Sequence, residues 1–523
     1  MKKYLLLLSL VMISSLAFAQ NISWLQSDSI SLTTNPQLPL HKLALTANGA
    51  VLAKTTATHQ LYGSFGFGDY VVDKVDTGGM LLFRVHLYGK IVVTAIATDG
   101  SDNIYVSGKY METLYINGND SLTNTGTGFN HNYFLMSFTP QGVLRWKKNL
   151  TLTNSDIYEI TTMEKDANGA VWYVWQQSTA FNHHIVQLDT NGNEIQSYTT
   201  SNTRLCSSIS FDPNNNLYLA GSTESGTITI NGYSETVPEQ YMMFASRINS
   251  GGQTSWVEFA YDITFQDPQI VALGNGDAIL GGTNMDSTNW GTINFPDNFF
   301  GTNIFVTRID STSNFLWGYA LPLNDTGYFA AGKGHFFDVD SDHNIYIGGT
   351  VQGTIHFTPG IVIHQGLPAT YNMAILKLDG NGQVISLKTG GTMNANYPQE
   401  IRISDVEQGF MSASIRGEAT FDAQTTGTAG VTSSMLLRFD DSNFTSGVEN
   451  LSSDALLAYP NPFSNQLKIV GMKNNVSVQL YDITGKLTYS TKVMNEVIQL
   501  PELVSGVYLL HIGDKVVRLV KAN

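Results

Sequence analysis

The sequence predicts an all-β protein, a seven-bladed β-propeller followed by a small Ig-like β-sandwich. Three observations carry this prediction. A hairpin pattern recurs seven times, aromatic residues make up 11% of the chain while charged residues make up only 14%, and there are 48 glycines. Few charges together with many aromatic residues and glycines suit strands and tight turns rather than helices. A chain of 523 residues is also too long for one ordinary core, unless it is an array of repeats.

The clearest hairpin pattern is residues 133–150, YFLMSFTPQGVLRWKKNL, in which apolar residues alternate on both sides of the turn 139–142. Alternation with period two gives a strand one buried face, so each copy is expected to form two short strands. Weaker copies occur at 70–83, 184–195, 243–256, 304–317, 373–385 and 435–444.

A second pattern of two strands around an Asp/Asn/Gly turn precedes each hairpin. It is clearest at 96–108, 209–221 and 337–349, with degenerate forms at 45–53, 164–174, 273–282 and 404–414. Asp, Asn and Gly suit such turns because they tolerate positive φ and make local side-chain hydrogen bonds. A repeat of about 60 residues with four short strands is typical of a propeller blade. Because copies three, five and seven are degenerate, six or eight blades remain alternatives.

The seventh hairpin copy lacks its second strand, whereas residues 21–25 stand alone before the first repeat. Trp24 in this segment matches the position of three hairpin tryptophans, Trp146, Trp256 and Trp317. We therefore expect the N-terminal strand to complete the last blade and close the ring, which would remove exposed sheet edges.

Residues 1–19 have the pattern of a secretory signal peptide. Lys2 and Lys3 precede an apolar run, and Ala17-Phe18-Ala19 forms a cleavage site before Gln20. The apolar run is shorter than the roughly 20 residues that a membrane-spanning helix needs. No later stretch is apolar enough to span, so no transmembrane segment is expected in the mature chain.

The net charge is −15, although residues 457–523 carry seven basic and only four acidic side chains. An acidic body argues against nucleic acid and anionic membranes as partners. Cys206 is the only cysteine, so no intrachain disulfide can form. We expect it to be half-buried and to serve packing.

The domain boundaries follow from these patterns. The propeller is expected over 20–446, a polar linker over 447–456 and a second domain over 457–523. Strands are expected in that domain at 466–470, 477–482, 486–493, 496–500, 507–512 and 515–520. This number of short strands within about 65 residues is typical of a small β-sandwich.

The repeats resemble the SBBP-type β-propeller repeat found in exported bacterial proteins. The matching residues are Asp99 with Asn103-Ile104-Tyr105-Val106-Ser107-Gly108, and Lys377-Leu378-Asp379 with Gly382. The resemblance covers about residues 38–446 and implies a fold rather than a function, because propellers have many unrelated activities.

The last domain resembles the type A C-terminal sorting domain of the type IX secretion system of Bacteroidetes. The motif residues that match are Tyr459, Pro460, Asn461, Pro462, Gly485, Gly506, Val507, Tyr508 and Lys521. The resemblance implies export through the Sec machinery and then recognition by the outer-membrane translocon. It also implies removal of the tail, with release or attachment at the cell surface. A carbohydrate-binding or Ig-like module is the alternative for this domain.

Residues that could carry chemistry are few. Asp338, Asp340, Asp342 and Asn344 place oxygen ligands at alternate positions, as calcium loops do. The run lacks the glycine and the closing glutamate of such a loop, so an Asx-bonded turn is favoured and no cofactor is expected. His183-His184 is expected to be a pair at a solvent-facing strand edge. Four aromatic residues could form a sugar platform or pack between blades, namely Tyr110, Tyr115, Phe129 and Tyr133.

Three functions remain open for an exported propeller. The first is a non-enzymatic scaffold that binds an extracellular protein or glycan by adhesion at the cell surface. The second is a glycan hydrolase or lyase whose catalytic groups come from different blades, and the third is a structural surface component. The sequence assigns no catalytic residue, because it does not show which side chains converge in space. If carboxylates meet a His or Tyr at the propeller axis, the enzyme hypothesis remains possible. A funnel lined only by Ser, Thr and apolar residues would exclude that hypothesis.

Overall fold

The structure of the protein is a computed structural model. It describes residues 22–30, 41–62, 65–124, 131–150, 157–177, 181–237, 242–261, 267–284, 287–296, 303–322, 325, 327–358, 361–363, 372–392, 396–404, 408–421, 424–440, 457–459, 463, 465–470, 476–482, 484–493, 497–512 and 515–521. The predicted signal peptide 1–19 and linker 447–456 lie outside these residues.

Every named element of the described chain is a β-strand, which confirms the all-β prediction. The chain divides into two compact units. The larger unit comprises residues 1–357 and 365–448, and the smaller unit comprises 449–523 with the short segment 358–364. The described part of the chain contains no helix with the length and hydropathy that crossing a bilayer requires.

Antiparallel sheets make up the larger unit. The first contains β2 (His41–Thr46), β3 (Gly49–Tyr62), β4 (Phe65–Asp76), β5 (Leu81–Thr98), β6 (Ile104–Ile116), β7 (Asp120–Thr123), β8 (Asn132–Phe138) and β9 (Leu144–Leu150). The next contains β10 (Ile157–Lys165), β11 (Val171–Gln177), β12 (Asn182–Leu188), β13 (Glu194–Ser201), β16 (Gly226–Ile230) and β17 (Tyr233–Val237). A four-stranded sheet follows, with β14 (Thr203–Phe211), β15 (Leu217–Thr223), β18 (Met242–Ile248) and β19 (Thr254–Tyr261).

Three further sheets complete the series. One contains β20 (Gln269–Ala272), β21 (Ala278–Asn284), β24 (Asn303–Ile309) and β25 (Phe315–Ala320). The next contains β26 (Tyr328–Ala331), β27 (Phe337–Val339), β28 (Ile345–Gln352), β31 (Asn372–Leu378) and β32 (Val384–Gly390), and the last contains β33 (Asn396–Ile403), β34 (Gln408–Arg416), β37 (Thr432–Asp440) and β1 (Ile22–Ser29). Two-stranded hairpins are β22 (Thr288–Trp290) with β23 (Ile293–Phe295), β29 (Ile355–Thr358) with β30 (Ile361–Ile363), and β35 (Ala419–Phe421) with β36 (Gln424–Thr426).

The strands coincide with the repeats found in the sequence. The clearest hairpin pattern, residues 133–150, forms β8 and β9. The two-strand pattern before it, residues 96–108, forms the end of β5 and the start of β6. The seventh copy forms β37, after which residues 441–456 lie outside the described chain. The core lies between successive sheets. Tyr105 and Leu135 of one sheet, for example, pack with Ile160 and Tyr173 of the next.

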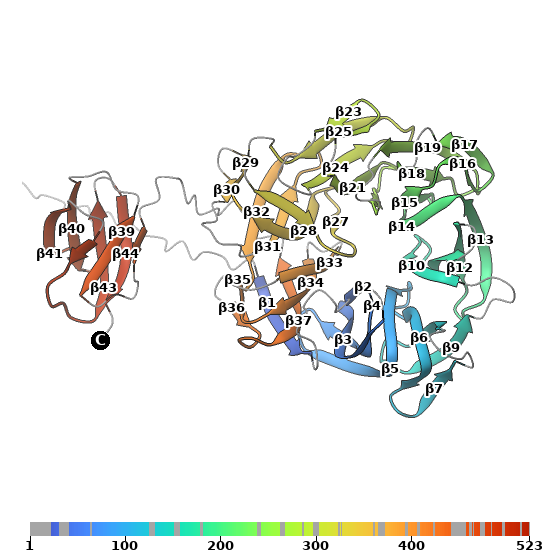
Figure 1. Ribbon diagram of the computed structural model, residues 1–523, viewed down its shortest axis with the longest axis horizontal. Coiled ribbons are helices and arrows are strands. Elements are labelled where there is room, and N and C mark those ends of the chain that lie inside the picture. The colour runs from blue at the N-terminus through green and yellow to red at the C-terminus, as the bar shows by residue number, and fades with distance from the viewer. Residues whose placement is uncertain are drawn as a thin grey trace, which may run out of the picture. The chain divides into compact units, whose positions relative to one another are not determined.

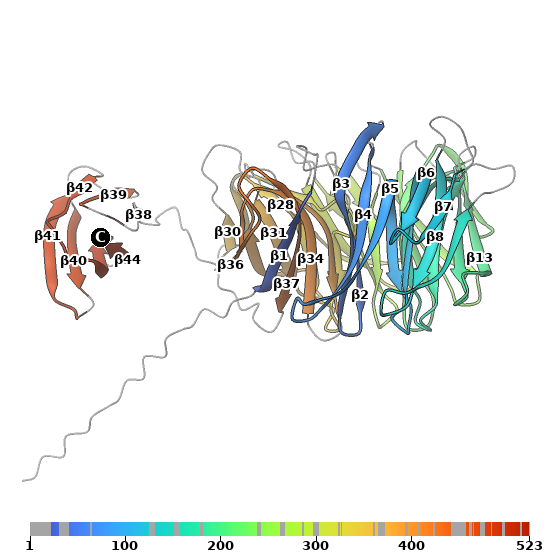
Figure 2. The same ribbon diagram turned by 90° about the horizontal axis from the view of Figure 1, so that it is seen from below.

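The first strands of successive repeats lie side by side around a common axis (Figure 1). The contacts run in chain order from β2 to β5, β10, β14, β20, β27 and β33. β33 then contacts β2, so the first strand of the last repeat lies against the first strand of the first repeat. The larger unit therefore has a propeller-like arrangement, in which the strands run roughly along the axis (Figure 2).

The N-terminal strand β1 pairs with β37, at the outer edge of the last sheet. The antiparallel register places Trp24 opposite Arg438 and Ser29 opposite Ser433. Trp24 Nε1 donates a hydrogen bond of 2.9 Å to the carbonyl oxygen of Thr77, in the β4–β5 turn. β1 thus joins the end of the repeat array to its beginning.

The same tryptophan contact recurs between other neighbouring repeats. Trp146, Trp256 and Trp317 each donate from Nε1 to a carbonyl in the next outer turn, at Thr190, Ser311 and Gly380, over 3.0 to 3.2 Å. Each of these turns has a residue with positive φ. In two of the turns it is a glycine packed directly against the indole, at 192 and 382. A Cβ at Gly192 would lie 2.7 Å from the Trp146 ring. The tryptophan and the turn glycine are therefore one packing unit that links repeats.

Gly192→Ala is expected to destabilise the protein more than Gly118→Ala does. Both glycines have similar positive φ values, 77° and 72°, so the backbone strain of alanine is matched. Only position 192 meets an indole, whereas a Cβ at position 118 meets nothing within 4 Å. Overpacking should add about 1–3 kcal/mol to the loss at position 192. Urea unfolding of both variants measures the difference, and equal losses would contradict the packing role of Trp146.

The smaller unit contains two sheets around one core. One sheet is β38 (Leu457–Tyr459), β39 (Gln466–Val470) and β42 (Val497–Gln499). The other is β40 (Val476–Asp482), β41 (Leu487–Val493), β43 (Gly506–Ile512) and β44 (Lys515–Lys521). Leu467 and Ile498 of the first sheet share an apolar cluster with Val478, Leu480 and Leu510 of the second. The six strands predicted in this domain are present, and β38 is an additional one.

Candidate functional site

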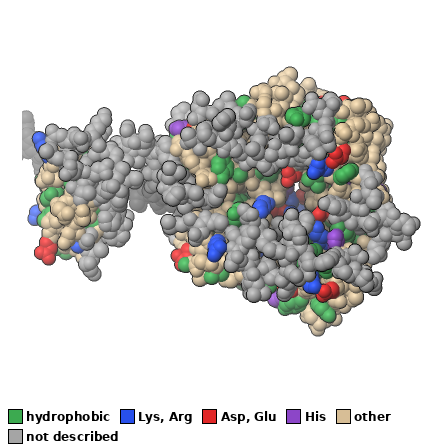
Figure 3. All heavy atoms as spheres, in the orientation of Figure 1, with side chains coloured by type: hydrophobic (Ala, Val, Ile, Leu, Met, Phe, Trp, Pro, Cys, Tyr) green, Lys and Arg blue, Asp and Glu red, His purple; other side chains and the backbone are tan. Residues whose placement is uncertain are grey.

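The larger unit has a cavity of about 720 Å³ on the axis, where its first strands meet. All the first strands or the segments next to them contribute lining residues, among them Lys42, Thr94, Glu159, Ser207, Gln269, His335 and Glu400. In the described part of the face seen in Figure 3, basic and acidic side chains lie around the hollow at its centre. The volume is in the range of sites that bind small molecules.

One-residue bulges turn hydroxyl side chains toward this cavity. Thr94, Thr161 and Ser207 are each skipped by the pairing of their inner strand with the next strand. A bulge leaves its extra residue out of the ladder and redirects the side chain. All three residues line the cavity. The hydroxyl of Thr161 donates to Cys206 O over 2.7 Å, and that of Ser207 donates to Pro268 O over 2.5 Å.

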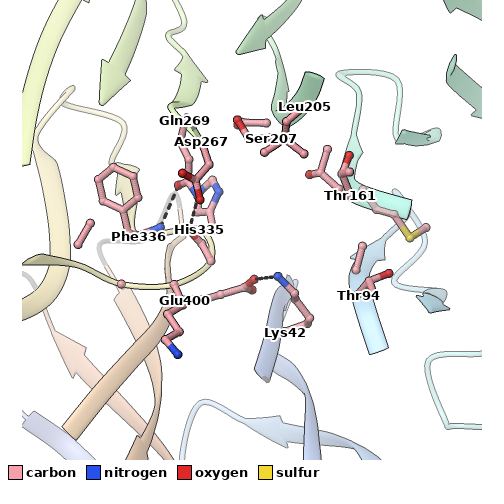
Figure 4. A pocket seen from close by; sticks show the side chains of 18 of the residues that line it. Lys42, Thr94, Thr161, Leu205, Ser207, Asp267, Gln269, His335, Phe336 and Glu400 are labelled. Carbon is pink, nitrogen blue, oxygen red and sulfur yellow. Dashed lines mark hydrogen bonds and ion pairs between the residues drawn. The ribbon is translucent and has the colours of Figure 1, made fainter. Parts of the chain in front are cut away.

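A longer interruption occurs between β26 and β27, which both pair with β28. Ala331 pairs with Gly349 and Phe337 pairs with Ile347, so residues 332–336 lie opposite Gly348 alone. We call residues 332–336, Gly-Lys-Gly-His-Phe, the axial insertion. Figure 4 shows that His335 and Phe336 of this insertion, with Glu400, face Thr94, Thr161 and Ser207 across the cavity.

The axial insertion is held by the two neighbouring repeats. Its backbone bonds to β33 through Gly334 N to Gln399 O, 2.8 Å, and Ile401 N to His335 O, 2.8 Å. On the other side, Gln269 Oε1 accepts the Phe336 N–H over 2.9 Å, and Gln269 Nε2 donates to Gly334 O. Gln269 is a positioning residue, since the oxygen and the nitrogen of its side-chain amide both hydrogen-bond to the backbone of the axial insertion.

Lys42 and Glu400 form an ion pair in the cavity wall, 2.9 Å between Nζ and Oε1. The Glu400 side chain is 5% exposed, and its Oε2 also accepts the Leu43 N–H over 2.6 Å. Burial alone would raise the pKa of Glu400, but Lys42, Arg402 and the Leu43 N–H together lower it below its ordinary value. Glu400 is therefore a carboxylate whose charge is balanced by Lys42.

Arg402 crosses the axis and contacts three other repeats. Nη1 donates to Glu164 Oε2 over 2.9 Å and to His335 Nε2 over 3.3 Å, and Nε donates to Leu43 O over 3.2 Å. Burial opposes its charge, but the carboxylates of Glu164, Glu400 and Asp338 raise the pKa of Arg402 overall. Glu164 lies near the end of β10, next to the β10–β11 turn. The Arg402–Glu164 ion pair therefore lies at the end of the cavity where such turns join first and second strands.

Glu159 is another carboxylate of the cavity wall, besides Glu400 and Asp267. Its carboxylate oxygens lie 3.4 and 3.5 Å from Lys109 Nζ. Burial raises the pKa of Glu159, and the charges of Lys109 and Lys42 only partly offset this effect. Glu159 is thus the carboxyl in this wall whose protonated form is favoured by its surroundings.

The cavity contains groups that keep the enzyme hypothesis open. Carboxylates and the imidazole of His335 both line it, so the lining is not restricted to Ser, Thr and apolar side chains. Sequence analysis singled out none of these cavity residues. Among the first strands that the structure describes, only the one with the axial insertion has four extra residues, and this length is the local signal that could have pointed to the site.

The calcium candidates do not form a shared oxygen cage. Asp340 Oδ1 accepts the N–H groups of Asp342 and Asn344 over 2.9 and 2.8 Å, and Oδ2 accepts Asn344 Nδ2 and the Tyr346 hydroxyl. Asp338 Oδ2 instead accepts the Ile403 N–H over 2.8 Å. The equivalent Asp99 and Asp212 make the same turn contacts. Among the described residues, no group of three or more His, Cys, Asp or Glu could hold a metal ion.

The aromatic residues proposed as a sugar platform do not share a surface. Tyr110 and Tyr133 are buried, which agrees with packing, while Tyr115 is exposed beside its cross-strand partner Tyr88. Phe129 lies outside the described residues.

Two expectations about burial were wrong. His183 is fully buried instead of lying at a solvent edge, because Nδ1 pairs with the Thr203 hydroxyl and Nε2 accepts the Cys206 N–H from the neighbouring sheet. Cys206 is fully rather than half buried, and this burial raises the pKa of its thiol to about 12. His184 is half-buried and stacks on Trp175, with ring centroids 4.0 Å apart.

Acid is expected to destabilise the protein through His183. Burial lowers its pKa from 6.5 to about 3, and nearby His184 adds to this shift. The unfolded chain takes up the proton near 6.5 and the folded chain does not, so stability is lost as the pH falls from 6.5 toward 3. His183→Asn keeps a hydrogen-bonding side chain but removes the titrating group, and it should reduce the slope of unfolding free energy by up to about 1.4 kcal/mol per pH unit. Urea unfolding between pH 7 and 4 measures both slopes, and identical slopes would contradict the assignment.

The sorting-motif residues lie in the smaller unit, except Pro460, Asn461 and Pro462, which are outside the described residues. Tyr459 ends β38, Gly485 has positive φ in the β40–β41 turn, and Lys521 pairs with Gly506. Val507 and Tyr508 lie in β43, where the Tyr508 hydroxyl donates to Val504 O over 2.7 Å. The motif thus contributes turns and core contacts to this unit.

Comparison with known families identifies the second domain. Residues 457–522 match the family model described as the secretion system C-terminal sorting domain. This match confirms the tail resemblance to the type IX secretion system, and the protein is therefore extracellular, either secreted or at the cell surface. The SBBP resemblance of the repeats stays a prediction. No curated protein matches the chain.

Several solved structures are similar to the chain at low identity. An inactive virginiamycin B lyase from Staphylococcus aureus is 10% identical over 79% of this chain and 98% of that chain, with a TM-score of 0.35. The Pan2 WD40 domain of Neurospora crassa is 12% identical over 68% and 92%, with a TM-score of 0.33. PorZ, a surface component of the type IX secretion system of Porphyromonas gingivalis, is 10% identical over 95% and 100%, with a TM-score of 0.17. Similarity at this level supports no statement about substrate or partner.

Proposed function

We propose that this protein is a non-enzymatic binding protein of the cell exterior, which binds an extracellular protein or glycan in the axial cavity. The observation that carries the proposal is the cavity itself, about 720 Å³ in volume and lined by polar side chains from every repeat. Sites of this volume with a few convergent polar groups are where small ligands bind. Export through the type IX translocon would deliver the protein to its ligand, and binding needs no metal or other cofactor.

The architecture behind this proposal is a closed, seven-bladed propeller of SBBP-type repeats, with an Ig-like tail. The order of contacts among the first strands, including β33 with β2, supports closure. Trp24 supports the role of β1 as the outer strand of the last blade, because its contact repeats those of Trp146 and Trp317. A closed ring would give the axial cavity rigid walls.

The charge pairing favours binding over catalysis. Glu400 is engaged by Lys42 and the Leu43 N–H, and Glu159 is engaged by Lys109. For Glu400 the pairing lowers the pKa of the carboxyl, so this group is a weak proton acceptor. Glu159 is the exception, because burial raises its pKa despite the contact with Lys109. The paired groups can still hydrogen-bond to a ligand without giving up or taking a proton.

An array of glycans and extracellular proteins, probed with the full chain, tests the proposal. Thr161→Phe would fill the cavity, whereas Thr420→Phe adds the same ring at an exposed position outside it. We expect binding to be lost in the first variant and kept in the second, with both variants folded by circular dichroism. If no arrayed molecule binds, or if Thr161→Phe binds as well as the wild type, the proposal is wrong.

A glycan hydrolase or lyase is the second candidate, favoured by one specific observation. Burial raises the pKa of Glu159, as for a general acid, and His335 lines the same cavity. Incubation with a polysaccharide panel would then release new reducing ends or unsaturated products, and Glu159→Gln would abolish the release. Absence of products from every polysaccharide in the panel would argue against this candidate.

A further inference from the structure

The walls of the axial cavity differ in hydrogen-bonding character. One wall supplies donors. Within the described residues, Lys42 Nζ donates only to Glu400, and the bonds of Arg402 use Nε and Nη1, so protons remain on Lys42 and on Arg402 Nη2. Across the cavity, Thr161 and Ser207 have already given their hydroxyl protons to backbone carbonyls, and their oxygens can only accept.

The formal charges of the cavity lining cancel overall, because Lys42, Lys333 and Arg402 oppose Glu159, Asp267 and Glu400. Lys42 is matched by Glu400 and Arg402 by Glu164, at 2.9 Å each, and Lys109 lies 3.4 Å from Glu159. A negatively charged ligand would gain little from cations that are already paired, and it would meet the carboxylates beside them. The carboxylate group of an acidic ligand also has no proton to donate to the acceptor wall. The cavity therefore suits a ligand whose groups both donate and accept, as alcohol hydroxyls do.

Thr94 provides an independent sign of a missing partner. It lies on a bulge in the cavity wall, the residue is 8% exposed, and its Oγ1 makes no hydrogen bond within the described structure. A buried hydroxyl without a partner costs about 1–3 kcal/mol. Rotation about χ1 to another staggered well exchanges the methyl and the hydroxyl, which can place Oγ1 toward the cavity.

Building on the proposed binding function, we propose that the axial cavity takes an uncharged, polyhydroxylated ligand, a short neutral saccharide. The ligand lies between the Lys42–Glu400 pair and the hydroxyl wall, where its hydroxyls accept from Lys42 and Arg402 and donate to Thr161 and Ser207. One of its hydroxyls supplies the partner that Thr94 lacks.

Calorimetric titration of the full chain tests the ligand class. The probes are the neutral trisaccharides cellotriose, maltotriose, xylotriose and laminaritriose, with trigalacturonate as the acidic probe of equal length. We expect at least one neutral trisaccharide to bind and trigalacturonate to bind at least tenfold more weakly than that one. Stronger binding of trigalacturonate, or no binding by any neutral probe, overturns the inference. The proposed function would survive either result if the array still showed binding that Thr161→Phe abolishes.

Two near-isosteric variants test the role of Thr94. Thr94→Val should leave stability unchanged or raise it, because the hydroxyl has no partner in the free protein, and it should weaken saccharide binding about tenfold. Thr46→Val is the matched control, since Thr46 Oγ1 is also buried without a hydrogen-bond partner but lies outside the cavity lining. It should change stability in the same direction and leave affinity unaltered. Equal affinities for wild type and Thr94→Val would overturn the contact.

Discussion

Deletion of residues 22–29 is expected to lower the melting temperature of the larger unit by roughly 10 °C or more. The deletion removes β1, which pairs along β37, and it removes Ile22, which is fully buried in the core of the last sheet. It also removes the Trp24 contact with the β4–β5 turn. Differential scanning calorimetry of the full chain and the deletion measures the change.

An ion-pair network adds to this effect. Asp28 of β1 lies 2.5 Å from Lys54 Nζ and 2.7 Å from Arg84 Nη2, and both cations also bind Asp73, which is buried. Without Asp28, two cations share one carboxylate in a partly buried site, which is unfavourable. Asp28 therefore fastens the N-terminal strand to the first repeat.

Two controls make the result specific to the pairing of β1. Ser23→Ala with Ser29→Ala changes only exposed positions of this strand and should leave the melting temperature unaltered. A synthetic peptide of residues 21–30 added to the deletion variant should raise its melting temperature in a concentration-dependent way. An unchanged melting temperature in the deletion variant would show that β1 does not close the ring.

Arg402→Met is expected to cost about 3–5 kcal/mol of unfolding free energy. The substitution leaves Glu164, Glu400 and Asp338 near the axis without the cation that they share, and burial raises the cost of an uncompensated carboxylate. The ion pair with Glu164 joins residues 238 positions apart, so its loss should loosen the contact across the axis.

Urea unfolding compares this variant with Arg204→Met. Arg204 is the matched control, because its side chain is 46% exposed and lies 3.6 Å from Glu224 at the surface. Surface pairs contribute about 0–1 kcal/mol, so Arg204→Met should change stability little. Similar losses in the two variants would contradict a special role for the Arg402 cluster.

Much of the strand arrangement could be predicted because it depends on local patterns. Alternating apolar residues and Asp/Asn/Gly turns located the hairpins, including β8 with β9, and the tail strands within about two residues. The tryptophan at position 24 was informative because its copies at 146 and 317 make the same contact with the next turn. Each repeat contains patterns of this kind within its own residues, so they can be recognised without knowledge of the rest of the chain.

The error at His183 shows where a local pattern fails. Its alignment with Asn132 and Asn303 suggested a polar strand edge. In the structure Asn182 holds that position, and His183 corresponds to the buried residues Tyr133 and Ile304. The burial of His183 depends on Thr203 and Cys206 of the neighbouring sheet, which supply partners for both ring nitrogens. No pattern within the repeat contains those partners.

The sequence by itself determined that this protein is all-β, repetitive and exported. The period-two alternation, the turn residues and the sorting motif each lie within short stretches of contiguous residues. The tertiary structure alone decided the site. Lys42 meets Glu400, 358 positions away, and bulges and an insertion turn Thr94 and His335 toward the axis. The physical reason is that a propeller-like fold brings one strand from every repeat to the axis, where residues distant in sequence become neighbours.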